Sequence, residues 1–249
     1  YRLRAEPRHH LTPSALKKVH ITSQLKANSY YTQEQYFAAE NAYQLALAYV
    51  EPQTAKWREM RELIASSIYF QAEAIAEYKS DDSADLLEKQ LLAVEHFLRL
   101  GKIVPESTYR VTAEFDAANI LLSQKQWPQA IIVLSDFEQR YPAHEFSATI
   151  PAKLAMVYEK TEQWSKAAKQ LLVMIEGDVS SEVKREAQYT AAEFYLKAND
   201  LTNAILTFRT YAHQYPQPFD IAQEVRVKMS DFYQQTKEPN KRYFWLRKI

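Results

Sequence analysis

The sequence predicts an all-α protein, a right-handed superhelical solenoid of about twelve helices arranged in antiparallel pairs. Apolar residues recur at three- and four-residue spacing in nearly every segment, which is typical of amphipathic helices. The 249 residues include only two glycines, Gly101 and Gly177, whereas average usage would give roughly 17. Tight hairpins and phosphate-binding loops need glycine where the backbone has positive φ. The composition therefore argues against sheets and nucleotide-binding folds.

The helical periodicity and the prolines between its segments define the expected helices. Pro105, Pro142 and Pro216 lie at or beside helix ends, where a missing N–H group costs least. Ser180 and Asp200 each precede a periodic segment and are expected to cap it. In chain order, the expected helices span residues 13–29, 33–50, 54–79, 84–101, 107–125, 127–140, 146–161, 164–176, 181–198, 201–214, 219–236 and 239–249.

The second half of the chain repeats every 37 residues. On the first helix of each repeat, the small positions are Ala118, Ala155 and Ala192, followed three residues later by Leu121, Tyr158 and Tyr195. On the second helix they are Ala130, Ala167 and Ala204, followed four residues later by Leu134, Leu171 and Phe208. Antiparallel helices approach closely only where one side chain is small and a large neighbour fills the adjacent space. Because one pair cannot bury both of its faces, the pairs are expected to stack into a solenoid with a concave surface.

The regularity of this pattern divides the chain into three parts. Residues 1–53 are expected to form an irregular N-terminal helix pair, and residues 54–106 a divergent pair of the same kind. Residues 107–249 are expected to hold the regular repeats. These repeats span residues 107–143, 144–180, 181–217 and a truncated 218–249.

The repeated residues resemble the tetratricopeptide repeat family. The clearest repeat carries the family pattern as Ala192, Tyr195, Ala204, Phe208 and Pro216. The chain departs from the family in its period of 37 residues, where the family has about 34. It also has large side chains where a second small one is usual, at Phe137, Met174 and Tyr211. The resemblance implies a solenoid that binds a protein or peptide partner and does not catalyse a reaction.

Two segments are similar to repeats of bacterial cell-envelope proteins. The segments WPQAIIVLSDFEQRYP, at 127–142, and LTNAILTFRTYAHQYP, at 201–216, each combine an alanine, a row of large apolar residues and a closing Tyr-Pro. Tol-Pal-associated, outer-membrane assembly and TonB-linked repeat proteins carry similar units. The resemblance implies a scaffold in a Gram-negative periplasm. Because such units also occur in cytoplasmic repeat proteins, a cytoplasmic location stays open.

The resemblance also implies a partner-binding groove, because in this family the first helix of each pair lines the concave surface. The candidate positions flank the small alanines by helical turns: Phe115, Asn119, Leu122, Met156, Glu159, Lys160, Tyr189, Glu193, Leu196, Lys197 and Arg226. They combine apolar anchors with surrounding charges, as recognition surfaces do. The Lys and Asn clamp with which chaperone-binding members hold a C-terminal carboxylate is not reproduced. Its comparable positions hold Thr149, Ala152, Lys153 and Met156.

No catalytic, cofactor or metal site is predicted. The chain has no cysteine, and its six histidines show no metal-binding spacing on a helix. His9 and His10 are expected to be solvated, and His96 to border the packed row of Phe97. The 31 basic and 31 acidic residues cancel, which disfavours a nucleic-acid partner. No apolar stretch is long enough to span a membrane.

Two other function classes stay open. The chain could be the ligand- or peptide-sensing helical domain of a cytoplasmic regulator, or the helical-array domain of a lytic transglycosylase. Each would require a further module outside this sequence. The missing initiating Met and signal segment lead us to expect a piece of a longer protein.

Aromatic residues concentrate at both ends of the chain. The N-terminal helices hold Tyr30, Tyr31, Tyr36, Phe37, Tyr43 and Tyr49. The expected final helix contains Tyr243, Phe244 and Trp245 and has no polar cap. Terminal repeats of a soluble solenoid need a polar outer face. The apolar final helix therefore predicts self-association or a continuation of the repeat array.

Overall fold

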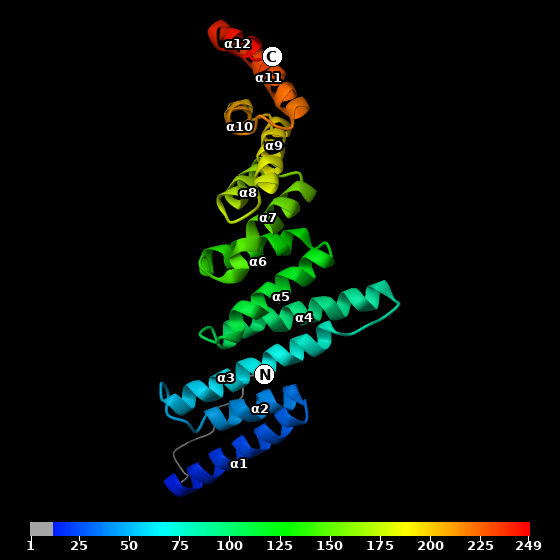
Figure 1. The fold of residues 1–249 in the computed structure, drawn as a ribbon. Coiled ribbons are helices and arrows are strands. Elements are labelled where there is room, and N and C mark those ends of the chain that lie inside the picture. Colours follow the sequence, from blue (N-terminus) through cyan, green and yellow to red (C-terminus); the bar gives the residue numbers. More distant parts are fainter. Residues whose placement is uncertain (1–11) are drawn as a thin grey trace. The chain divides into compact units, whose positions relative to one another are not determined.

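The computed structural model describes residues 12–249, and within that range it contains twelve α-helices and no strand (Figure 1). The helices are α1 (Pro13–Thr32), α2 (Tyr36–Leu47), α3 (Ala55–Ala76), α4 (Ser83–Ile103), α5 (Tyr109–Ser123), α6 (Trp127–Arg140), α7 (Ile150–Lys160), α8 (Trp164–Glu176), α9 (Ser181–Lys197), α10 (Leu201–Gln214), α11 (Phe219–Gln235) and α12 (Pro239–Leu246). We call the odd-numbered helices first helices and the even-numbered ones second helices. The predicted all-α class is confirmed.

The predicted helix boundaries agree closely with the observed ones. Helices α6, α8 and α10 begin and end at the predicted residues. The segment predicted as one helix over 146–161 instead begins with a 3₁₀ turn, η2 (Glu145–Thr149), before α7. Pro151 explains this difference, because it has no N–H group to donate to the carbonyl of Ser147 four residues earlier. The α-helical hydrogen-bond ladder therefore cannot extend back across this turn.

The helix pairs turn without glycine. A residue with positive φ follows the first helix in five of the pairs: Glu34, Lys125, Glu162, Asn199 and Lys237. In each case the N–H group of the following residue donates to the carbonyl five residues before it. The bond from the Gln126 N–H group to the Leu121 carbonyl, for example, is 2.8 Å. This bond pattern ends many helices and usually uses glycine. The scarcity of glycine therefore does not prevent tight turns, although side chains adopt this conformation at a cost of about 1–2 kcal/mol each.

The described chain forms two compact units, divided between Gln126 and Trp127. Unit 1 contains α1 to α5, and unit 2 contains α6 to α12. Within each unit, consecutive helices contact each other along the chain. The finer division into repeats stays a prediction.

A buried polar network joins three helices of unit 1. Glu40 on α2 is only 2% exposed. Its carboxylate accepts hydrogen bonds of 2.8 Å from Gln71 on α3, from Arg99 on α4 and from Gln44 one turn further along α2. A buried charge is stable only when it is paired and hydrogen-bonded. The network therefore fixes how α2, α3 and α4 pack.

Close packing between α4 and α5 depends on Gly101. A Cβ atom at this position would lie 2.8 Å from the Nε atom of Arg110 and 3.2 Å from Oε1 of Glu114. These two side chains form an ion pair of 2.8 Å along α5. Glycine on α4 thus leaves room for an ion pair on its neighbour.

The core of unit 2 reproduces the predicted alternation of small and large side chains. Ala167, Ala192 and Ala204 are fully buried, and so is Phe208 on α10. The cluster around Phe208 includes Ala192, Tyr211, Val225, Met229, Phe232, Tyr233 and Trp245. Alanines at the helix crossings allow the close approach that these bulky side chains then fill.

Candidate functional site

The first helix α7 of unit 2 has one exposed face. On α7, Leu154 and Ala155 are buried, whereas Met156 is 37% exposed and Glu159 and Lys160 are exposed. Side chains four residues apart share a helix face, so Met156 and Lys160 lie together with Glu159 beside them. Three of the predicted groove residues therefore form an exposed surface of mixed chemistry.

On α9, two of the predicted groove residues instead bind the next first helix. The Tyr189 hydroxyl donates to Glu224 at 2.8 Å, and Lys228 on α11 donates to Tyr189 at 3.0 Å and to Glu193 at 2.5 Å. Burial lowers the pKa of Lys228, but its bonds to Glu193, Tyr189 and Glu224 outweigh this effect and raise the pKa overall. Tyr189 and Glu193 thus couple α9 to α11, and only their half-buried outer edges could meet a partner.

The remaining predicted positions of unit 2 contact their own surroundings. Leu196 is half-buried against the core cluster around Phe208. The ammonium group of Lys197 lies 4.5 Å from the ring centre of Trp164 on α8, and the guanidinium of Arg226 lies 6.0 Å from that of Phe219. Lys197 is exposed, whereas Arg226 is half-buried. Lys197 is thus the more accessible of the two cations.

The predicted groove residues are distributed over both units. Phe115, Asn119 and Leu122 lie half-buried on α5 in unit 1, whereas the other eight lie in unit 2. The structure brings Tyr189 and Glu193 together through Lys228. The predicted groove residues thus belong to two separate units, and their role in binding stays a prediction.

Unit 1 carries an aromatic surface that the sequence reasoning missed as a site. Five half-buried rings from four helices lie in mutual contact, and we call them the aromatic platform: Tyr31, Tyr36, Tyr69, Phe70 and Tyr109. The Tyr36 and Phe70 rings stack with their centres 5.3 Å apart, and the centres of Tyr69 and Tyr109 lie 5.4 Å apart. The adjacent pair Tyr69-Phe70 in the middle of a first helix was the sequence signal for it.

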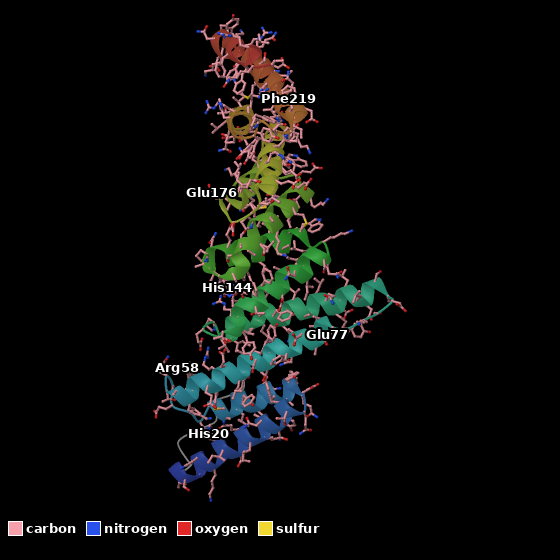
Figure 2. The ribbon with its side chains drawn as sticks, in the orientation of Figure 1. His20, Arg58, Glu77, His144, Glu176 and Phe219 are labelled. Atoms are coloured by element: carbon pink, nitrogen blue, oxygen red, sulfur yellow. The ribbon has the colours of Figure 1, made fainter. Side chains whose placement is uncertain are left out.

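Carboxylates border the aromatic platform. Asp116 on α5 accepts a hydrogen bond of 2.9 Å from the Tyr69 hydroxyl. Burial raises the pKa of Asp116, although this hydrogen bond lowers it. Burial also raises the pKa of Glu73, and the neighbouring carboxylates of Glu77 and Asp116 raise it further. Figure 2 labels Glu77, which follows the last turn of α3.

No metal or membrane site is found in the part of the chain that the structure describes. Within residues 12–249, no three His, Cys, Asp or Glu side chains are grouped to hold a metal ion. His96 is half-buried on α4, where burial and then the charge of Arg99 lower its pKa. His9 and His10 lie outside the described residues. None of the described helices combines the length and apolar character that crossing a bilayer requires.

Comparison with known proteins supports a repeat of the predicted type. The family model "Tetratricopeptide repeat" matches residues 186–218, which cover most of α9, all of α10 and the segment up to Pro218. No curated protein matches the sequence. Among solved structures, the chain is similar to the "Crystal Structure of the Apo Form of RapI", with 13% identity, a TM-score of 0.34, and coverage of 95% of this chain and 74% of that one. Residues 186–218, which contain the motif Ala192, Tyr195, Ala204, Phe208 and Pro216, thus match one tetratricopeptide repeat.

Proposed function

We propose that the chain is a non-catalytic scaffold that holds a protein or peptide partner on the open faces of its first helices. The observation that carries the proposal is the exposed surface of α7, where Met156 offers an apolar contact beside the charges of Glu159 and Lys160. An apolar anchor with a charged surround is the usual composition of a recognition surface. The match of residues 186–218 to a repeat whose role in other proteins is binding supports the same assignment.

We further propose that the scaffold belongs to a cell-envelope complex in the periplasm. The support is the resemblance of the segments at 127–142 and 201–216 to envelope repeats, each ending in Tyr-Pro. These segments correspond to the second helices α6 and α10 with the residues that follow them. The partner is accordingly expected in the envelope fraction of the cell.

Site-specific photocrosslinking tests the scaffold function. A benzoylphenylalanine residue placed at Met156 or at Lys160 is expected to crosslink a partner protein in native cells, because both positions lie on the open first-helix face. The matched control is Val173, which is 46% exposed but lies on the second helix α8. Fractionation of the cells before analysis locates the crosslinked product.

Equal crosslinking from Val173 and from the two α7 positions would contradict the proposed face. A crosslinked product found only in the cytosolic fraction would agree with the scaffold function but would refute the envelope assignment. The absence of any product from Met156 and Lys160 would count against the scaffold function itself.

A further inference from the structure

The aromatic platform of unit 1 combines exposed ring area with negative charge. Its rings come from α1, α2, α3 and α5, and each remains partly accessible to solvent. Aromatic ring faces carry partial negative charge and attract cations within about 6 Å of their centres. The platform therefore offers several adjacent sites for a cationic group.

The carboxylates beside the platform strengthen this preference. Glu73 is exposed one turn after Tyr69 and Phe70 on α3, and Asp116 is held against the Tyr69 hydroxyl. Burial raises the pKa of Glu73, and the charges of Glu77 and Asp116 raise it further, so negative charges lie near one another here. Like charges grouped at a partly buried surface repel one another, and a cation between them relieves the repulsion.

Two arginines on the helices of the platform already have carboxylate partners. On α3, Arg61 forms an ion pair with Glu106 and donates at 2.9 Å to the carbonyl of Ile103. On α5, Arg110 pairs with Glu114 at 2.8 Å. Neither arginine thus has Glu73 or Asp116 as its ion-pair partner.

We propose that the aromatic platform of unit 1, with Glu73 and Asp116, binds an arginine-containing basic segment of the partner protein. This inference rests on the proposed scaffold function and specifies the chemistry of one of its contacts. Arginine fits better than lysine, because its planar guanidinium stacks on rings and forms paired hydrogen bonds with a carboxylate. The partner is thereby expected to present positive charge to unit 1.

Fluorescence anisotropy with a short labelled peptide of alternating arginine and alanine tests the inference. In the matched probe, citrulline replaces every arginine. The citrulline side chain has nearly the same shape as that of arginine but carries no charge. The arginine peptide is expected to bind the chain at least about tenfold more tightly than the citrulline peptide. The double variant Glu73→Gln/Asp116→Asn is expected to lose about tenfold in affinity for the arginine peptide, and the loss should shrink at high salt.

A charge-matched control separates this surface from general attraction of a cation. The double variant Glu186→Gln/Asp231→Asn removes two exposed carboxylates of unit 2 and should bind the arginine peptide within about twofold of wild type. Equal binding of the arginine peptide by wild type and by Glu73→Gln/Asp116→Asn would overturn the inference. Equal binding of the arginine and citrulline peptides, or binding of neither, would overturn it as well.

Thermal unfolding tests whether the double variant is folded. A carboxyl group whose pKa is raised in the folded state contributes stability at low pH and loses it as pH rises through that pKa. Because the pKa values of Glu73 and Asp116 are both raised, removing their charges should leave the melting temperature at neutral pH equal or higher. Weaker peptide binding by a variant at least as stable as wild type would thus reflect lost recognition.

Failure of this inference can be distinguished from failure of the scaffold function. Crosslinking of a partner from Met156 or Lys160 without peptide binding at the platform would refute only the basic-segment inference. Loss of both results would refute the scaffold function too.

Discussion

Phe208→Ala is expected to destabilise unit 2 by about 3–5 kcal/mol, the usual cost of deleting a buried aromatic side chain. Phe208 is fully buried on α10, with ring centres 5.7 Å from Tyr189 on α9 and 5.9 Å from Phe232 on α11. The ammonium group of Lys228 also lies 5.2 Å from its ring centre. Removing the ring therefore leaves a cavity where three helices meet. Urea denaturation followed by circular dichroism measures the change in the free energy of unfolding.

Leu206 provides the control on the same helix. It is 48% exposed, so Leu206→Ala should change the free energy of unfolding by no more than about 0.5 kcal/mol. If Phe208→Ala were as stable as Leu206→Ala, the repeat packing described for unit 2 would be wrong.

Glu40→Ala is expected to destabilise unit 1 by about 3 kcal/mol, near the lower end for breaking a buried ion pair. The carboxylate binds Gln71 and Arg99 on two other helices. Without it, the half-buried guanidinium of Arg99 loses its carboxylate partner and the Gln71 amide keeps only its bond of 3.2 Å to the Ser67 carbonyl. Leaving a charge partly buried and unpaired is costly. The Arg99 side chain is 33% exposed, which moderates the penalty. The shift in the midpoint of chemical unfolding of unit 1 measures this destabilisation.

An exposed ion pair serves as the comparison for this network. Glu59 pairs with Lys56 at 3.0 Å on the surface of α3, and Glu59→Ala should cost less than about 1 kcal/mol. The double variant Glu40→Met/Arg99→Met should recover most of the stability lost in Glu40→Ala, because it removes both charges. A Glu40→Ala variant as stable as Glu59→Ala would show that the network does not stabilise unit 1.

The sequence was sufficient to predict the class and most helix boundaries. Helix periodicity and flanking proline placed α6 correctly, and the alternation of alanine with large side chains predicted the buried positions Ala192, Ala204 and Phe208. These features are local or repeat at fixed spacing, so a single sequence displays them. Two helix starts were misjudged. The helix predicted from residue 33 begins at Tyr36, and the helix predicted from residue 146 begins at Ile150 after η2, because Pro151 removes a hydrogen bond.

The candidate site was less accessible to sequence reasoning. Helical spacing placed Tyr189 and Glu193 on the first-helix face. Only the three-dimensional packing shows that Lys228 of α11 donates hydrogen bonds to both side chains. The aromatic platform forms from helices far apart in the sequence, so Tyr36 and Tyr109 showed no sequence relationship to each other. Contacts between distant segments follow from packing, which periodicity within one helix does not encode.

Hydrogen–deuterium exchange of the chain with its crosslinked partner protein tests the central claim most directly. Protection on binding should appear in first helices, on α7 around Met156 and Lys160 and on α3 and α5 around the aromatic platform, because these faces are proposed to hold the partner. The second helices α8 and α10 should exchange as in the free chain. Protection confined to α8 and α10, or no change in any helix, would contradict a scaffold that binds through its first helices.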